Sequence, residues 1–363
     1  MTNQLHHPSV CLTPEQTTII RNNVHKAEAA EQLQPEQIAL AVEQRWFTML
    51  VPLQYNGLQK ALPEMVRLEE AIAWADGSMG WVVTLCSGAG WFGGFMQPSL
   101  ADAVFANPHA CLAGSGAATG TAEETAEGYL VSGKWWHASG APHNTVFTAN
   151  CRLVKEGKVL TDAAGQPLVK AFALMREEVT LIPTWQSFGL VATASHAFEV
   201  QQLLVPANRL FAIEPDAAII KAPLYQYPFL QLAEVTLAAN ISGMALHFIE
   251  EAEAIVQQKN EKEQPVAQQY VRDAQEMMEQ ARRIFYTSLD ASWQQQVFTG
   301  EVSVEALQEI SVAARTLAAK SIQAVQMLYS YCGLAAANKH SVINQVWRDI
   351  HTASQHSLLV YPR

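Results

Sequence analysis

The chain has 363 residues, of which 49% are hydrophobic and 16% are charged, and its formal net charge at pH 7 is −11. This acidic balance argues against nucleic acid and anionic membrane surfaces as partners, because phosphate groups are bound by clustered Lys and Arg. The low share of charged residues indicates that other subunits cover part of the surface, so we expect a homo-oligomer, most simply a tetramer.

The first hundred residues have the apolar spacing and the capping signals of helices. The segment TPEQ at 13–16 is a capping box with Pro14 in the first helical position. The segments that begin at Pro35 and Pro63 repeat this arrangement, each with an acidic residue directly after the proline. The pattern predicts a helical N-terminal domain over residues 1–107.

The stretch from Gly77 to Ala101 has no charged residue and is long enough to cross a membrane. It contains six glycines, together with Ser, Thr, Gln and Pro. This composition favours a buried, glycine-rich helix over a membrane span. The small residues would let a ligand or another backbone approach closely.

The middle of the chain, residues 108–213, consists of short segments that are rich in β-branched and aromatic residues and are separated by Gly, Asn and Pro. These are strand signals at the spacing of a β-barrel or β-sandwich. Helical periodicity returns over about 229–259, 265–298 and 303–332, followed by a shorter segment. We therefore predict an α+β, multidomain protein whose residues 214–363 form an antiparallel four-helix bundle.

The cysteines and the first residues indicate a reducing compartment. The five cysteines are scattered and include no C-x-x-C pair, so no metal site is expected. The opening MTNQLHHPSV has neither a basic region nor an apolar region of the kind found in secretion signals. We expect a cytoplasmic protein with no membrane attachment.

Four segments carry candidate chemistry: CLAGSGAATGTA at 111–122, SGKWWHASGAPHN at 132–144, WQSFGLVATASH at 185–196 and VWRDIHTASQH at 346–356, which we place on the last helix. Each also has a plain structural interpretation. A Gly/Ser segment is commonly a turn, one of the adjacent Trp135 and Trp136 can be a core residue, and a lone helical His is more often structural than catalytic. No G-x-G-x-x-G follows a strand and no P-loop motif occurs.

Taken together, the α–β–α order and the four segments resemble the acyl-CoA dehydrogenase superfamily. The chain looks most like the two-component, reduced-flavin-dependent monooxygenases of the 4-hydroxyphenylacetate and steroid-phenol hydroxylase type. AGS at 113–115 resembles the loop at the flavin pyrimidine edge, GKWWHASG resembles the G-x-W-x-x-x-S-G strand, and GLVATAS followed by FEVQQLLVP resembles the next pair of motifs. WRDIHTASQH resembles the terminal R-D helix.

Departures from the family patterns separate its two branches. The dehydrogenases carry a catalytic Glu on the terminal helix, whereas no Asp or Glu follows Asp349 here and the chain offers His356, as the oxygenases do. The dehydrogenases also carry an Arg in the bundle that reaches the FAD pyrophosphate, but the hinge NEKEQP at 260–265 has none. Val191 stands where the family often has Arg.

The resemblance implies a function and a set of site residues. The expected reaction is hydroxylation of an aromatic or polyketide-like molecule through a flavin C4a-hydroperoxide, with O₂ as co-substrate and loosely bound reduced FMN or FAD from a separate reductase. His356 would be the acid/base, and Ser139 would bond near the flavin N5–C4a edge. The implied flavin-binding residues are Gly114, Ser115, Trp136, His137, Ser139, Thr193 and Ser195. The implied substrate-binding residues are Trp81, Phe92, His143 and Trp185.

Two other functions stay open from the sequence. The first is an acyl-CoA dehydrogenase-like FAD oxidoreductase that acts on CH–CH groups, against which the missing Glu argues. The second is a non-catalytic oligomer that binds flavin or a small ligand. The reaction product separates the first from a monooxygenase, and binding of reduced flavin tests the second.

Overall fold

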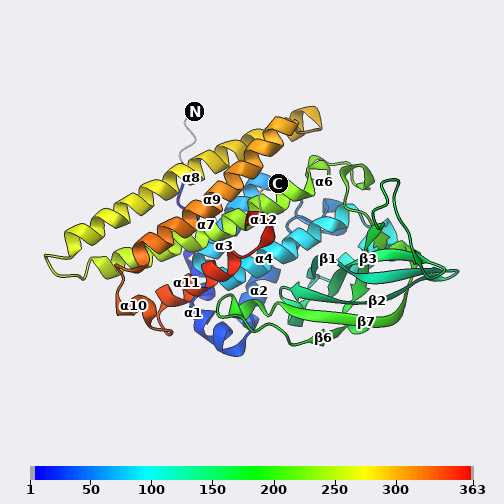
Figure 1. The fold of residues 1–363 in the computed structure, drawn as a ribbon, viewed down its shortest axis with the longest axis horizontal. Coiled ribbons are helices and arrows are strands. Elements are labelled where there is room, and N and C mark those ends of the chain that lie inside the picture. Colours follow the sequence, from blue (N-terminus) through cyan, green and yellow to red (C-terminus); the bar gives the residue numbers. More distant parts are fainter. Residues whose placement is uncertain (1–4, 361–363) are drawn as a thin grey trace.

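The computed structural model describes residues 5–360, and it divides them into helical, β and helical parts in the predicted order (Figure 1). The first part contains α1 (Pro14–Ala30), α2 (Pro35–Glu43), α3 (Leu62–Ala75), α4 (Gly77–Gly90) and α5 (Pro98–Phe105). The predicted capping box is present, because the Thr13 hydroxyl accepts from Gln16 N and the Gln16 side chain accepts from Thr13 N.

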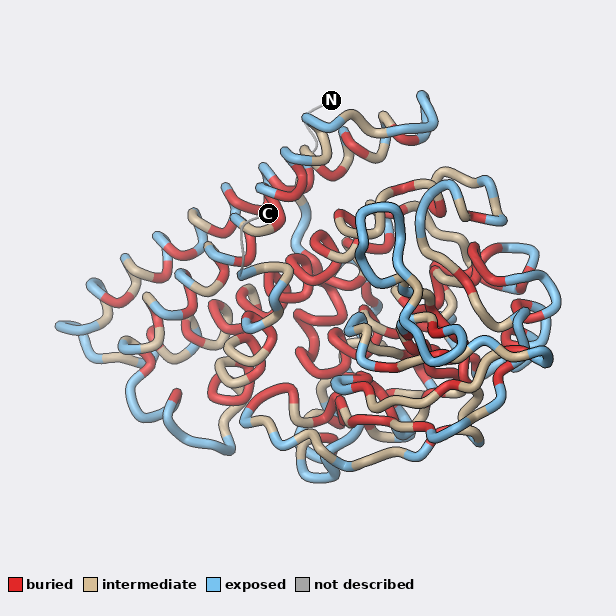
Figure 2. The backbone as a smooth tube through the Cα atoms, turned by 45° about the vertical axis from the view of Figure 1, so that its right-hand side comes forward, coloured by how far each residue is buried: buried red, intermediate tan, exposed pale blue. Residues whose placement is uncertain are grey.

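Helix α4 is the buried, glycine-rich helix that the sequence predicts. Its N-terminus is capped by Asp76, whose carboxylate accepts from Met79 N at 2.8 Å. Its glycines allow close packing: a Cβ added at Gly80 would lie 2.5 Å from Ala73 Cα on α3. The buried residues concentrate where the helical parts and the sheet meet (Figure 2).

The central part is one mixed sheet in the order β6-β7-β2-β1-β3-β5-β8, with β4 paired to β3. The strands are β1 (Leu112–Thr125), β2 (Gly128–Ala138), β3 (Val146–Lys155), β4 (Lys158–Val159), β5 (Val169–Met175), β6 (Thr180–Ile182), β7 (His196–Val205) and β8 (Leu210–Phe211). The pair β1–β3 is parallel and the other pairs are antiparallel.

The sheet curves around its own apolar core, as in a partly open barrel. Phe198 on β7 stacks on Trp135 of its neighbour β2, with ring centroids 5.1 Å apart. The same ring lies 4.8 Å from Phe147 on β3, although β2 and β1 stand between β7 and β3 in the sheet order. The central part is therefore a single bent sheet and not two packed sheets.

The last part contains α6 (Pro223–Gln226), α7 (Phe229–Val256), α8 (Gln264–Thr299), α9 (Val304–Tyr329), α10 (Leu334–Ala337), α11 (Val342–Ala353) and α12 (Ser357–Val360). The three long helices run side by side, and the shorter α11 lies beside α4 (Figure 1). The changes of element type fall beside the predicted boundaries at 107/108 and 213/214, while the division into domains itself stays a prediction.

A buried ion pair joins the bundle to the N-terminal helices. Arg282 on α8 donates to both carboxylate oxygens of Glu70 on α3 at 2.7 Å, and Ser242 and Tyr286 also donate to that carboxylate. These four donors hold the pKa of Glu70 below its ordinary value despite burial. Among the described residues, α7 is the one helix that is long and apolar enough to cross a membrane, and 89% of its most apolar window is buried inside the protein.

Candidate active site

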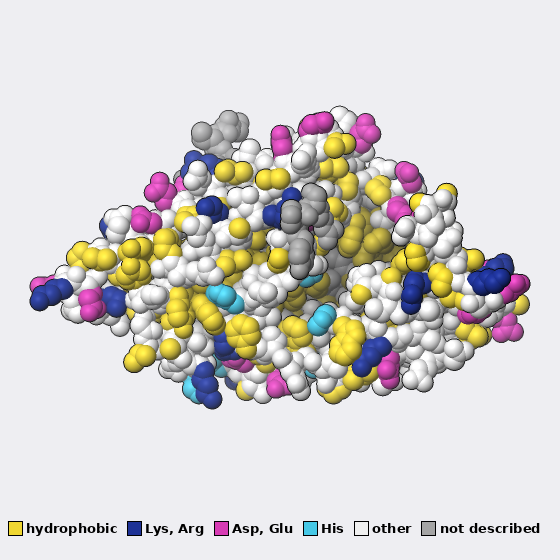
Figure 3. All heavy atoms as spheres, in the orientation of Figure 1, with side chains coloured by type: hydrophobic (Ala, Val, Ile, Leu, Met, Phe, Trp, Pro, Cys, Tyr) yellow, Lys and Arg dark blue, Asp and Glu magenta, His cyan; other side chains and the backbone are white. Residues whose placement is uncertain are grey.

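A cavity of about 220 Å³ lies between α4, α7, the start of β1 and the C-terminal end of the described chain. Figure 3 shows hydrophobic and histidine side chains on the face where the helices meet the sheet. Two glycines leave room in the cavity wall, since a Cβ added at Gly88 on α4 or at Gly116 on β1 would meet no atom within 4 Å. The walls are otherwise apolar, apart from Thr84, Ser115, Thr148, Asn150, Thr236 and His356.

The β1 wall of the cavity owes its shape to an irregularity in the sheet. The pairing of β1 with β3 shifts register between Ser115 and Gly120, which leaves the segment between them free of the regular ladder. Asn150 on β3 holds that segment by donating to the Gly116 carbonyl at 3.0 Å. Gly114 is required for close packing, because a Cβ there would lie 1.9 Å from Thr148 Oγ1.

His356 lines the cavity, although it does not lie on the last long helix as the sequence predicted. Helix α11 ends at Ala353, because Ser354 Oγ and the Gln355 side-chain amide both donate to the His351 carbonyl and end the helical ladder. The chain then turns His356 toward α4, where its ring centroid is 6.1 Å from that of Trp81. Leu358 N donates a weak hydrogen bond of 3.4 Å to Nδ1 of the same ring.

The cavity has no charged wall. Among the described side chains that line it there is no Asp, Glu, Lys or Arg, and His356 is the one titratable group. Thr84 on α4 is held from behind, since Asn240 on α7 donates to its hydroxyl at 2.8 Å. Walls of this kind, once a ligand covers them, strengthen the few polar contacts that the ligand makes with them.

Three predicted flavin residues form a chain of buried hydroxyls at the end of β2. Ser139 Oγ lies 2.9 Å from Ser195 Oγ, and Ser195 Oγ lies 2.8 Å from Thr193 Oγ1. Thr193 Oγ1 donates to the Leu190 carbonyl at 2.8 Å. The backbone joins the same segments, because Gly140 N donates to the Thr193 carbonyl at 2.7 Å.

The loop that carries two of these hydroxyls is fixed to α11. Asp349 accepts from Leu190 N at 2.5 Å, and Arg348 donates to the Phe188 carbonyl at 2.6 Å. Gly189 packs so closely on α11 that a Cβ would lie 2.0 Å from the Arg348 carbonyl oxygen. Burial, with the nearby carboxyl of Asp76, raises the pKa of Asp349 well above its ordinary value.

The other predicted aromatic flavin and substrate residues gather on the surface beside this loop. Trp136 is 44% exposed, and Lys134 Nζ lies 4.4 Å from its ring centroid. His137 has a left-handed backbone (φ 66°), and its ring packs edge-on to Trp185 at 5.9 Å. The Trp185 indole donates to the Leu190 carbonyl. These three residues do not line the cavity, and their roles stay predictions.

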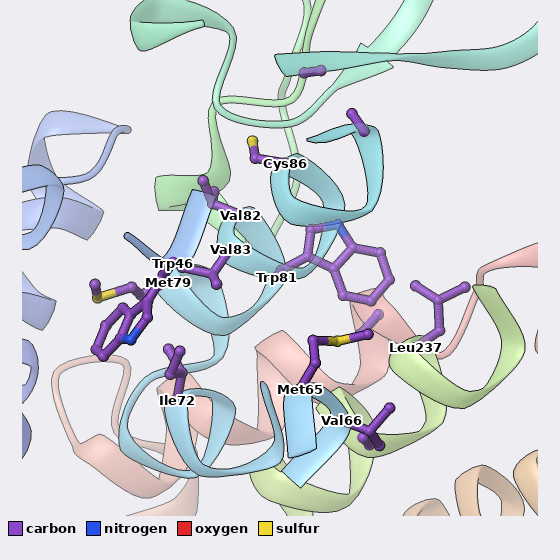
Figure 4. Close-up of a cluster of buried hydrophobic side chains, with 14 of the residues drawn as sticks. Trp46, Met65, Val66, Ile72, Met79, Trp81, Val82, Val83, Cys86 and Leu237 are labelled. Atoms are coloured by element: carbon purple, nitrogen blue, oxygen red, sulfur yellow. The ribbon is translucent and has the colours of Figure 1, made fainter. Parts of the chain in front are cut away.

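Two predicted substrate residues, Trp81 and His143, do not line the cavity. The ring of Trp81 lies beside Leu237 and Met65 in the apolar cluster (Figure 4), and Leu237 is the residue that faces the cavity. His143 packs against Phe47, and its Nε2 is buried without a hydrogen-bond partner. Burial lowers the pKa of His143 to about 4, so the ring is neutral. Of the predicted substrate residues, Phe92 lines the cavity directly.

The sequence did not single out Thr84, Thr148, Asn150 or Asn240. One signal was available, since Thr84 and Asn240 are polar residues inside otherwise apolar helices, where a buried polar group requires a partner. The identity of that partner could not be read, because the two residues are 156 positions apart.

Comparison with known proteins agrees with the architecture. Residues 235–361 match the family described as acyl-CoA dehydrogenase, C-terminal domain. The chain is 24% identical to indole-3-acetate monooxygenase of Acinetobacter baumannii over 86% of this chain and 80% of that protein. It is also 24% identical to the flavin-dependent monooxygenase oxygenase subunit HsaA of Mycobacterium tuberculosis, over 93% of this chain and 88% of that protein.

Solved structures have the same fold. The crystal structure of HsaA from M. tuberculosis superposes with a TM-score of 0.86 at 22% identity, covering 95% of this chain and 93% of that one. XiaF from Streptomyces sp., solved in complex with FADH2 and glycerol, superposes with a TM-score of 0.79 at 20% identity, covering 95% and 89%. The predicted resemblance is therefore confirmed: the chain has the acyl-CoA dehydrogenase fold, and its relatives include proteins named as monooxygenases and as the oxygenase subunit of a flavin-dependent monooxygenase.

Proposed function

We propose that this protein is the oxygenase component of a flavin-dependent monooxygenase that hydroxylates a small aromatic molecule. The observation that carries the proposal is the uncharged cavity with His356 as its one titratable group among the described residues. At about 220 Å³ the cavity lies below the roughly 300–1,000 Å³ of sites for drug-sized ligands, which favours a compact substrate over a large polyketide. The relatives support this class, because their names describe monooxygenases and hydroxylases.

The residues present fit a flavin. No side chain fills the space at Gly88 on α4 or at Gly116 on β1, which leaves room for a flat ring in the cavity. The hydroxyls of Ser139, Ser195 and Thr193 do not line the cavity, so a ring whose edge bonds to Ser139 would extend from the cavity toward the end of β2. The hinge at 260–265 offers no Arg for a pyrophosphate, so we expect loose binding, and the choice between FMN and FAD stays open.

Bound reduced flavin would supply the electrons that activate O₂ for transfer of one oxygen atom to the substrate. The walls around Thr84 and Phe92 carry no charged group that would hold water in the reacting volume. Ser139 holds the flavin edge, and His356 moves the substrate proton, as a side chain that exchanges protons near neutral pH can do. The aromatic surface at Trp136, His137 and Trp185 would cover the flavin face outside the cavity.

A CH–CH dehydrogenase has less support. That reaction requires a carboxylate or another strong base to take an α-proton, and no carboxylate lines the cavity among the residues that the structure describes. Asp349 and Asp76 are buried on the other side of α4 and α11, where Asp349 binds the Leu190 backbone. A non-catalytic flavin binder would have the same fold, and the reaction product decides that case.

The decisive experiment supplies the protein with reduced FMN or FAD and ¹⁸O₂ in the presence of a panel of small phenols, indoles and aromatic acids. A hydroxylated product with one labelled oxygen supports the proposal. A desaturated product would establish the dehydrogenase. Binding of reduced flavin without any product from the whole panel would favour the non-catalytic interpretation.

We also propose a cytoplasmic homotetramer that receives flavin from a separate reductase. Exposed apolar side chains support association: Phe298 is 84% exposed and Leu334 is 89% exposed, both in the C-terminal part. Light scattering tests the assembly, and a particle of 39.9 kDa at micromolar concentration would contradict it.

A further inference from the structure

In the hydroxyl chain at the end of β2, only one arrangement of the protons turns all three contacts into hydrogen bonds. A hydroxyl group has one proton to donate, and a carbonyl can only accept. Thr193 Oγ1 uses its proton on the Leu190 carbonyl. The 2.8 Å contact between Thr193 and Ser195 therefore needs the Ser195 proton, and the 2.9 Å contact between Ser195 and Ser139 needs the Ser139 proton.

The Leu190 carbonyl, at the end of the hydroxyl chain, is held in place by its surroundings. The Leu190 carbonyl also accepts from Thr193 N at 3.1 Å and from the Trp185 indole at 2.9 Å, and Leu190 N is held by Asp349. Thr193 and Ser195 are buried, so water does not supply other donors or acceptors to them. Each hydroxyl therefore donates to the next group, in the order Ser139, Ser195, Thr193 and the Leu190 carbonyl. In this order Ser139 Oγ has lone pairs to accept a hydrogen bond and no free proton to donate.

We propose that this directed hydroxyl chain makes Ser139 a hydrogen-bond acceptor toward the flavin and thereby selects reduced over oxidised flavin, with Thr193 as the residue that sets the direction. The inference rests on the proposed function, which places Ser139 at the flavin N5 edge. Reduced flavin carries a hydrogen on N5 and can donate it to Ser139. Oxidised flavin has only an acceptor at N5, so two acceptors would face each other.

The direction of donation along the hydroxyl chain can reverse when oxidised flavin binds, but the hydroxyl chain then loses one hydrogen bond. In the reversed order Ser195 donates to Ser139 and Thr193 donates to Ser195, so the Leu190 carbonyl loses the Thr193 hydroxyl. One hydrogen bond corresponds to a preference of about tenfold. Such a preference suits an oxygenase that must capture reduced flavin from a reductase and release it after oxidation.

Thr193→Val tests the direction, because it removes the hydroxyl and keeps the shape of the side chain. Without that hydroxyl, the arrangement in which Ser139 donates to Ser195 and the arrangement in which Ser195 donates to Ser139 have equal numbers of hydrogen bonds. The ratio of the dissociation constants for oxidised and reduced FMN should then fall about tenfold, measured anaerobically for the reduced form. The midpoint potential of bound FMN should move down by about 30 mV, the equivalent of tenfold for two electrons, because the variant loses its preference for the reduced form. Ser195→Ala should act in the same direction.

Two matched variants separate the chain from general damage to the loop. Thr193→Ser keeps the hydroxyl and should restore the wild-type ratio. Ser187→Ala lies on the same loop outside the chain, with a 3.4 Å contact to Thr352, and should leave the ratio unchanged. A folded Thr193→Val protein with the wild-type ratio overturns the inference and leaves the proposed function intact. A wild-type protein that binds neither form of FMN nor FAD overturns the proposed function and the inference with it.

Discussion

Asp349 on α11 accepts a hydrogen bond from the backbone N–H of Leu190, 159 residues earlier in the chain, at 2.5 Å. Both groups are buried. Burial and the nearby Asp76 raise the pKa of Asp349 well above its ordinary value, which favours the neutral carboxyl as the acceptor in this contact. The contact joins the helix that precedes His356 to the loop that carries Thr193 and Ser195.

Asp349→Ala should destabilise the protein by about 1–3 kcal/mol, because it leaves the Leu190 N–H buried without a partner. Asp349→Asn keeps a neutral acceptor of the same shape and should be close to wild type at pH 7. Urea unfolding measures both. Gln345→Ala is the control, since it truncates a buried residue one turn earlier on α11 whose Oε1 has no hydrogen-bond partner. Equal losses for the Ala and Asn variants would show that the negative charge is required and the neutral-acceptor explanation is wrong.

Glu69 on α3 is a second buried carboxyl with a raised pKa, close to the helix that forms the cavity wall. Ser87 Oγ on α4 donates to Glu69 Oε1 at 3.0 Å and lies 3.1 Å from the Thr84 carbonyl. Burial raises the pKa of Glu69 from 4.5 to about 8, although the hydrogen bond from Ser87 acts in the opposite direction.

This raised pKa predicts a stability loss with rising pH. Between its unfolded and folded pKa values the folded state binds more protons at Glu69 than the unfolded state, so the free energy of unfolding decreases as pH rises through this window. Glu69→Gln removes the effect. Its stability relative to wild type should increase by about 1.4 kcal/mol per pH unit between about pH 5 and pH 8. The check is urea unfolding at several pH values, with Glu64→Gln, an exposed residue on the same helix, as the control. A pH-independent difference would show that Glu69 is ionised in the folded protein.

Two glycines on α4 should respond in opposite directions to alanine. Gly88→Ala places a methyl group in open space and removes a helix-interior glycine, so it should stabilise the protein by up to about 1 kcal/mol. Gly80→Ala places the same group 2.5 Å from Ala73 Cα and should destabilise it. Thermal unfolding compares the two. A bulkier Gly88→Leu should preserve the fold and weaken substrate binding, because the new side chain enters the cavity.

The sequence predicted the elements better than their contacts. Capping residues and a 3.6-residue period are local signals, which is why the segment predicted at 229–259 became α7 (Phe229–Val256). Periodicity identifies a buried face without naming its partner, so the contacts of Asp349 with Leu190 and of Asn240 with Thr84 could not be read. The end of α11 was missed for a related reason: it depends on side chains of Ser354 and Gln355 that compete for the His351 carbonyl.

The position of His356 beyond α11 makes the sharpest test of the active site. His356→Ala should lower hydroxylation by about 10²–10⁴-fold, the usual effect of removing a positioned acid or base. It should spare binding of reduced flavin, because Ser139, Ser195 and Thr193 keep their hydroxyls in the variant. Oxygen consumption should then continue with release of hydrogen peroxide in place of hydroxylated product. Product yield and peroxide are measured per reduced flavin consumed.

His351 provides the matched control. It lies on α11, where its ring stacks on Trp347 at 4.3 Å and its Nδ1 contacts the Trp347 carbonyl, and it does not line the cavity. His351→Ala should therefore keep most of the hydroxylation. If His351→Ala loses hydroxylation and His356→Ala keeps it, the proton transfer belongs to His351 and the assignment to His356 is wrong. If both variants hydroxylate as well as wild type, neither ring handles the substrate proton, and Thr84, which lines the same cavity, becomes the next polar group to test.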